Sequence, residues 1–366
     1  MNDKPTPPNS GITGKKERNS NLELYRIIVM LAIVAHHYVV NSGLGTVLVD
    51  EPLQARSWFF YFFGMWGKTG INCFVLITGY FMCHSEITLR KFLKLILWIM
   101  TYKVILTIAF VATGYIALTP KALIMGLIPF YNLNSGFTGG FIMYWLCIPF
   151  LNVMVRYFTQ RQHLWCMAWC LLVYALMSKV GMIRLNYVVW FSVLHVIASY
   201  IRFYGLPREK DTRFWMFSTF ICIVLSLLSV CLFRMTGIRP WAWLVSDSNS
   251  PLALLVGITS FMLFKNLQVP QSRLINTVAA STFGVLLIHA NSDAMRQWLW
   301  KDTLQVPTHF YSDYYMLIAL ISVIGVFTIC AVIDIARARF TESWLLDKTE
   351  KVILSIHARI TEKKDG

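Results

Sequence analysis

The chain has 366 residues, of which 57% are hydrophobic and only 14% are charged, and its mean hydropathy is +0.57. Soluble domains carry about a quarter charged residues, so this composition excludes an ordinary soluble domain and predicts a polytopic membrane protein. The net charge of +15 comes from Lys and Arg dispersed among the connections between apolar runs. Nucleic acid is therefore not an expected partner, because a nucleic-acid-binding protein would gather these charges in one domain.

Apolar runs of about 17 to 25 residues, the length that crosses a bilayer as a helix, recur along the chain. They predict an all-α membrane bundle of about ten transmembrane helices. The expected spans are residues 22–40, 58–82, 92–117, 141–157, 164–178, 188–204, 214–234, 251–266, 275–291 and 314–337.

The segments outside these runs define three regions. Residues 1–18 are polar and rich in Pro, Gly and Lys, which predicts a disordered cytoplasmic tail. Residues 19–340 form the predicted transmembrane domain. The charged residues 341–366 predict a cytoplasmic C-terminal tail that contains a short helix. Within the domain, prolines and glycines interrupt residues 118–140, which favours a loop or a re-entrant element.

The distribution of basic residues predicts the orientation. Roughly two thirds of the Lys and Arg fall on the side of the membrane that holds the N-terminus. The positive-inside rule then places both termini in the cytoplasm and predicts a multi-pass protein of the plasma or inner membrane. The eight cysteines lie almost entirely within apolar stretches and include no C-x-x-C pair, so they are interpreted as buried apolar residues rather than metal ligands.

The first span contains two ionisable residues, Arg26 and His37, eleven positions apart. Eleven positions at about 100° each bring His37 to within about 20° of Arg26 on the helix surface, and roughly 16 Å along its axis. His36 lies about 80° away from that line. One face of the helix therefore presents both groups, and an elongated molecule could contact both.

An imidazole inside a membrane span is a candidate general base, because burial favours its neutral form. His37 is thus predicted to accept a proton from an attacking hydroxyl. The alternative is a histidine that only hydrogen-bonds a neighbouring helix. His36 is expected to pack against or orient its neighbour, and Glu23 is expected to pair with Arg26 in a role that is either structural or catalytic.

Polar residues also interrupt the second span. Lys68, Asn72 and Thr78 predict a polar cavity that faces the first helix, and the glycines beside them permit close helix packing. A cationic cluster follows before the third span, formed by Arg90, Lys91 and Lys94. It is either a phosphate-binding site or a topology signal.

These features resemble the acyltransferase-3 family of integral membrane acyltransferases over nearly all of residues 20–340. The hallmark of that family is an Arg and a His separated by ten residues in the first span, here Arg26 and His37. The segment Gly70-Ile-Asn-Cys-Phe-Val-Leu-Ile-Thr-Gly-Tyr-Phe81 resembles its second-span signature, with threonine where serine is usual.

Three further blocks carry the same resemblance. The cluster at Arg90 matches a basic cluster that is usually richer in arginine. The segments Pro149-Phe-Leu-Asn152 and Ser281-Thr-Phe-Gly-Val-Leu-Leu-Ile-His289 resemble two other blocks, the second with leucine where tyrosine is usual. Asp293 and Arg296 follow as charged residues do in the family.

The resemblance implies an O-acyltransferase that moves an acyl group, usually acetyl, from cytoplasmic acyl-CoA to a hydroxyl of a cell-surface polysaccharide or its lipid-linked precursor. Its expected partners are acyl-CoA, the carbohydrate acceptor and membrane lipids, with no permanently bound cofactor and no metal. Acyl-CoA (acetyl-CoA) is the co-substrate that the resemblance implies.

The expected roles of the residues follow from this reaction. Arg26 and the cluster of Arg90, Lys91 and Lys94 would hold the CoA phosphates, and His37 would be the base. Lys68 or Asn72 would stabilise the oxyanion. His289 and Arg296 would face the acceptor or anchor a helix end. A covalent acyl-histidine stays open as a variant of the mechanism.

Two other classes of function fit parts of the same pattern. A proton-coupled transporter or flippase also places Arg, Lys and His within membrane spans. No inverted repeat is visible in this sequence, and Asp334 is the main acidic residue within a span. A membrane sensor without chemistry would leave the spacing of Arg26 and His37 unexplained.

Overall fold

Helices make up all the regular structure in the described part of this computed structural model, which covers residues 19–120, 124, 136–237 and 243–365. The predicted all-α class is confirmed. The elements in chain order are α1 (Ser20–Val40), α2 (Leu44–Asp50), α3 (Ala55–Gly64), α4 (Gly67–Met82), α5 (Leu89–Ala112), α7 (Phe137–Tyr157), α8 (Gln160–Leu171), η1 (Leu172–Met177), α9 (Tyr187–Tyr204), α10 (Thr212–Met235), α11 (Pro251–Asn266), α12 (Arg273–Ala280), α13 (Thr282–His289), α14 (Asp293–Arg296), η2 (Gln297–Thr303), α15 (Val306–His309), α16 (Tyr315–Phe340) and α17 (Glu342–Asp365).

Within the described residues, six helices are long and apolar enough to cross a membrane: α1, α5, α7, α9, α10 and α16. A seventh candidate is the segment from α12 to η2, which bends by 95° after His289. Helix α11 is apolar but shorter. The molecule is therefore a multi-pass helical membrane protein, while the expected count of about ten spans is not reached by these criteria.

Several of the expected spans are not single continuous α-helices, among them 275–291, which is divided into α12 and α13. The predicted span 58–82 is divided into α3 and α4 by a break at Met65 and Trp66. The predicted span 164–178 begins within α8 and continues as the π-helix η1. The expected tail at 1–18 and most of the expected loop at 118–140 lie outside the described residues.

Local sequence signals set several helix starts. Thr88 accepts a hydrogen bond from the backbone N–H of Lys91 and so caps α5. Thr159 and Gln162 form a reciprocal capping box at the start of α8. Each cap satisfies backbone donors that the first helical turn leaves unpaired.

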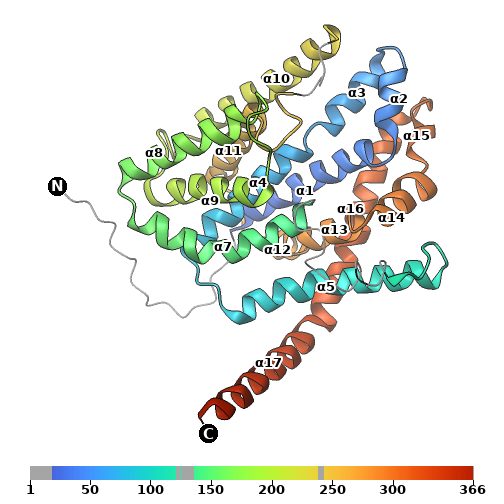
Figure 1. Ribbon diagram of the computed structural model, residues 1–366. Coiled ribbons are helices and arrows are strands. Elements are labelled where there is room, and N and C mark those ends of the chain that lie inside the picture. Colours follow the sequence, from blue (N-terminus) through green and yellow to red (C-terminus); the bar gives the residue numbers. More distant parts are fainter. Residues whose placement is uncertain (1–18, 121–123, 125–135, 238–242, 366) are drawn as a thin grey trace.

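Helix α1 lies at the centre of the bundle (Figure 1), where it packs against α3, α4, α11, α12, α13 and α16. Glycines allow its antiparallel partners to approach. A Cβ atom at Gly64 would lie 2.7 Å from Cβ of Val39, and one at Gly70 would lie 2.7 Å from Cγ1 of Ile33. Such small residues are what close helix packing in a membrane requires.

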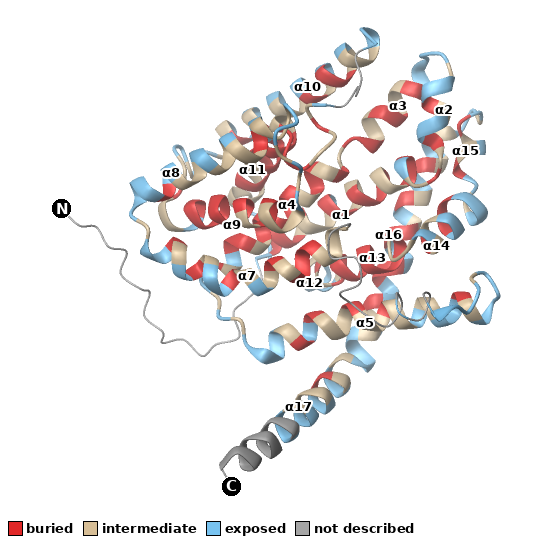
Figure 2. Ribbon diagram, in the orientation of Figure 1, coloured by how far each residue is buried: buried red, intermediate tan, exposed pale blue. Residues whose placement is uncertain are grey.

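Buried residues gather around α1, whereas the outer helices carry more exposed residues (Figure 2). Phe217 and Phe220 of α10 and Ile321 and Ile324 of α16 are all more than half exposed. Exposed apolar side chains on long helices fit contact with lipid tails rather than with water. Helix α17 projects away from the bundle beneath α5 (Figure 1), in agreement with the helix expected in the C-terminal tail.

Candidate functional site

Two histidines from distant parts of the chain meet inside the bundle. Nδ1 of His37, near the end of α1, lies 2.8 Å from Nε2 of His289, the last residue of α13. The two ring centroids are 5.0 Å apart. Nδ1 of His289 lies 2.6 Å from the carbonyl oxygen of Val285, one turn earlier in the same helix. His289 is completely buried, whereas His37 keeps some exposed surface.

This meeting depends on the bend of the chain after α13. Because α12 and α13 run alongside α1, the final turn of α13 reaches the level of His37. The chain then turns by 95° into α14 and η2, so His289 ends its helix rather than lying in the middle of a straight span.

The imidazole of His36 points elsewhere. Its Nδ1 donates to the carbonyl oxygen of Gly64, 2.5 Å away at the end of α3. The backbone of Gly67 packs directly on the same ring, and a Cβ atom there would overlap it. His36 is therefore held between α3 and α4.

Two cations lie close to the histidine pair. Lys68 and Arg296 are both near enough to act electrostatically on His37. Lys68 donates a hydrogen bond of 2.7 Å to the hydroxyl of Tyr187 on α9, and Arg296 forms an ion pair of 2.7 Å with Asp293. The predicted site residues His37, Lys68, His289 and Arg296 therefore share one region.

Buried donors without partners lie beside the same pair. Trp300, in the π-helix η2, packs edge-to-face against His289 with ring centroids 6.3 Å apart, and also against Tyr38. Both rings are buried, yet Nε1 of Trp300 and the hydroxyl of Tyr38 have no hydrogen-bond partner among the described residues. Unpaired buried donors are rare, and π-helices are frequent at functional sites. The sequence offered no periodic signal for Trp300.

The opposite end of α1 holds Arg26. Its guanidinium lies 3.5 Å from the buried carboxylate of Glu23, as the spacing of three residues predicts. Beside them, the Asn21 side chain donates to the carbonyls of Lys265 and Leu267 at the end of α11. Arg26 therefore lies about ten residues along the same helix from the histidine pair rather than in contact with it.

Two other predicted site residues lie away from the histidine pair. The Asn72 amide donates to the carbonyl of Ser248 at 2.6 Å and accepts from Nε1 of Trp190 at 2.9 Å, so both ends are engaged between α4, α9 and the segment before α11. The Thr78 hydroxyl donates to the carbonyl of Phe74 in its own helix. These contacts join helices or satisfy a hydroxyl, and none of them includes His37.

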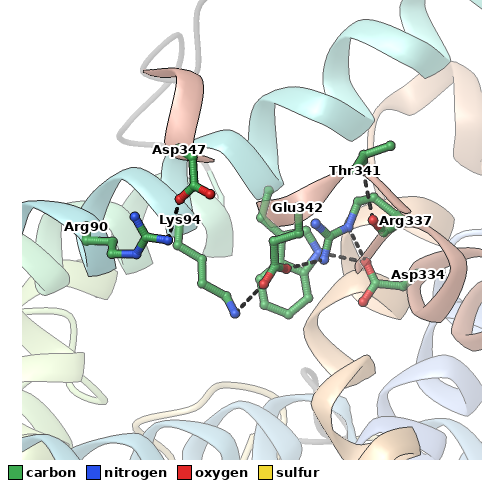
Figure 3. Close-up of polar contacts among 8 residues, drawn as sticks. Arg90, Lys94, Asp334, Arg337, Thr341, Glu342 and Asp347 are labelled. Atoms are coloured by element: carbon green, nitrogen blue, oxygen red, sulfur yellow. Dashed lines mark hydrogen bonds and ion pairs between the residues drawn. The ribbon is translucent and has the colours of Figure 1, made fainter. Parts of the chain in front are cut away.

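The cationic cluster on α5 is in contact with α17 (Figure 3). Arg90 pairs with Asp347 at 2.6 Å and with Glu350, and Lys94 pairs with Glu342 at 2.5 Å. Lys91 instead donates to Ser85 and to the carbonyl of Glu86, both before α5. Burial alone would raise the pKa of the Glu342 carboxyl, but hydrogen bonds from Lys94 and Arg337 lower this pKa below its ordinary value.

A buried ion pair lies next to this cluster and was not among the predicted site residues. One oxygen of Asp334 accepts from Nε1 of Trp98 at 2.8 Å, from the hydroxyl of Tyr102 at 2.7 Å and from Nε of Arg337 at 2.8 Å. Arg337 also reaches Glu342 at 3.1 Å (Figure 3). The spacing of three residues between Asp334 and Arg337 is the signal that would have found the pair.

A small pocket lies where α5, α16 and α17 meet, and its lining includes Lys94, Trp98, Thr101, Arg337 and Glu342. It is mixed in character, with cations and a carboxylate beside apolar side chains. In the described part of the chain, no three His, Cys, Asp or Glu side chains are grouped as metal ligands would be.

Comparison with models of protein families, with curated proteins and with solved structures found no match for this chain.

Proposed function

We propose that this protein is a membrane-embedded O-acyltransferase that moves an acyl group, most simply acetyl, from cytoplasmic acyl-CoA to a hydroxyl of a cell-surface polysaccharide or its lipid-linked precursor. The observation that carries the proposal is the contact of 2.8 Å between His37 and His289 inside a helical membrane bundle. A buried imidazole held by a second group is the arrangement that general-base catalysis uses.

The proposed reaction is direct transfer. The acceptor hydroxyl gives its proton to His37 while its oxygen forms a bond to the thioester carbonyl carbon. The tetrahedral intermediate collapses by breaking the carbon–sulfur bond, and the departing thiolate takes the proton back from His37. The products are an O-acyl ester and free CoA. Lys68, one of the two cations near His37, would stabilise the oxyanion of the intermediate.

In this proposal one end of α1 helps to bind acyl-CoA and the other end carries the general base. Arg26 lies toward one end and His37 toward the other, roughly 16 Å apart on one face. An extended pantetheine arm spans such a distance. Arg90, Lys91 and Lys94 would bind the phosphates of acyl-CoA on the cytoplasmic side, together with Arg26. In this orientation both termini lie in the cytoplasm.

A transporter or flippase is the second candidate, and one observation favours it. The segment from α12 to η2 is a broken helix pair bent by 95°. Discontinuous helices of this kind form substrate sites in many transporters. The bend also ends α13 at His289, which contacts His37, so the same bend is compatible with the acyltransferase.

The test compares wild-type protein with His37→Ala in lipid nanodiscs, supplied with radiolabelled acetyl-CoA and cell-envelope carbohydrate. We expect the wild type to release CoA and to label the carbohydrate, and the variant to do neither while it elutes and melts as the wild type does. Normal acyl transfer by the His37→Ala variant would refute the assignment of His37 as the general base. If neither protein consumes acetyl-CoA or a longer acyl-CoA, while proteoliposomes take up lipid-linked sugar, the transporter is the better description.

A further inference from the structure

The hydrogen bonds of His289 determine where its proton lies. Its Nδ1 is 2.6 Å from the carbonyl oxygen of Val285. A carbonyl oxygen only accepts hydrogen bonds, so Nδ1 of His289 must carry a proton and donate it. The question that remains is whether Nε2 of the same ring also carries one.

The surroundings of His289 favour the neutral ring. The residue is completely buried, and in the described part of the chain no carboxylate contacts either imidazole of the pair. Arg296 adds a positive charge nearby. A buried positive charge on His289 without an acidic partner would be costly. Neutral His289 therefore has its proton on Nδ1 and a lone pair on Nε2.

This assignment fixes the tautomer of His37. Because Nε2 of His289 is an acceptor, Nδ1 of His37 must donate across the distance of 2.8 Å. The lone pair of His37 then lies on its Nε2. That nitrogen makes no hydrogen bond to any described residue, and His37 is only half-buried.

We infer that His289 is a positioning residue, which fixes His37 as the Nδ1-protonated tautomer and leaves Nε2 of His37 as the nitrogen that takes the proton of the acceptor hydroxyl. The chain of hydrogen bonds runs from His37 through His289 to the carbonyl of Val285. The orientation of the pair stands on its geometry, whereas the identity of the proton donor rests on the proposed function.

The proton balance follows from this arrangement. When Nε2 of His37 takes the proton, the ring becomes an imidazolium that is still donating from Nδ1 to the lone pair of His289. The proton on Nε2 then passes to the departing thiolate, which restores the starting tautomer. In this scheme His289 bonds to His37 and to neither substrate. Its replacement should therefore affect kcat rather than substrate binding.

The first test reads the tautomer without any reaction. Protein labelled with ¹⁵N-histidine is reconstituted in lipid, and its imidazole nitrogens are observed by solid-state NMR. The chain has eight histidines, so the signals of His37 are assigned by their loss in His37→Gln. We expect a protonated Nδ1 and an unprotonated Nε2. A proton on Nε2 of neutral His37 would overturn the inference, whatever the protein catalyses.

The second test compares His289→Gln with His289→Phe. The amide oxygen of Gln reaches about as far as Nε2 of His and still accepts from His37, whereas Phe fills the space without an acceptor. We expect kcat to stay within about tenfold in the Gln variant and to fall about 10²-fold or more in the Phe variant, with KM for acetyl-CoA unchanged in both.

The outcomes separate the two proposals. Equal kcat in the Phe variant and the wild type would reject a positioning role, and an equal loss in both variants with a lowered melting temperature would show a structural role instead. If the wild type transfers no acyl group, the proposed function fails, and the NMR experiment alone decides the tautomer.

Discussion

His37 and His289 are 252 positions apart in the sequence, yet Nδ1 of the first lies 2.8 Å from Nε2 of the second. The contact joins α1, which carries the charged pattern of the first span, to the end of α13. Because His289 is in turn bonded to its own helix through Val285, the orientation of His37 is tied to the position of α13. Any change that displaces α13 is expected to affect this pair.

The first prediction concerns the two neighbouring histidines of α1. His36→Ala removes a hydrogen bond to the carbonyl of Gly64, whereas His37→Ala removes the partner of His289. We expect His36→Ala to retain acyl transfer within about tenfold and His37→Ala to lose it, because only the second changes the proposed base. Initial rates of CoA release in nanodiscs measure both. An equal loss of acyl transfer in the two variants would contradict the assignment of different roles to His36 and His37.

The face of α1 was predictable because helical periodicity is local. The spacing of Arg26 and His37 requires only the geometry of a single helix, and the positions of Glu23 and His36 follow from the same rule. Periodicity cannot identify a partner on another helix. The sequence therefore indicated His289 as a candidate site residue but did not predict its contact with His37.

Breaks in helices were harder to predict than helices. Hydropathy reads residues 58–82 as one apolar run, but the chain ends α3 at Gly64 and begins α4 at Gly67. Nothing in hydropathy distinguishes a continuous helix from two helices joined by a short break. The π-helix at Trp300 carried no signal either, because hydropathy does not distinguish a π-helix from an α-helix.

The glycine contacts give a second prediction, on stability. Gly70→Ala places a Cβ atom 2.7 Å from the Ile33 side chain, whereas Gly45→Ala meets nothing within 4 Å. We expect Gly70→Ala to destabilise the protein by about 1–3 kcal/mol through overpacking. Gly45→Ala is the matched control and should be neutral or stabilising by about 0.5–1 kcal/mol, because alanine favours the helix. Thermal melting in detergent compares them, and equal melting temperatures would contradict the close packing of α1 and α4.

A third prediction concerns the ion pair between Asp334 and Arg337. Asp334→Ala removes the acceptor of three hydrogen bonds, from Trp98, Tyr102 and Arg337, and leaves Arg337 with Glu342 as its carboxylate partner. Removing one partner of a buried pair typically costs about 3–5 kcal/mol. Asp293→Ala breaks a pair whose carboxylate is 96% exposed, so its effect should stay within about 0.5 kcal/mol. The melting temperatures of the two variants test this, and comparable small shifts would show that Asp334 is not a structural anchor.

The last prediction concerns the contact between α5 and α17. Arg90 faces Asp347 and Glu350 from the C-terminal helix, so phosphates that bind Arg90 must displace these carboxylates. Replacing them by Asp347→Asn with Glu350→Gln should therefore lower KM for acetyl-CoA, by a factor of about two to ten, because exposed ion pairs are weak. Arg90→Ala should raise KM, with kcat unchanged because the residue is far from the proposed chemistry.

The control for this experiment is Lys348→Gln, which alters the charge of α17 at a side chain that packs on Trp344 rather than on α5. Its KM should equal that of the wild type at the same ionic strength. Raising the salt concentration should weaken the ion pairs of Arg90 and the binding of phosphates together, so the difference between the double variant and the wild type should shrink. If the double variant binds acetyl-CoA less tightly than the wild type, α17 supports the cationic cluster instead of competing for it, and Arg90→Ala would then be expected to act through the position of α17.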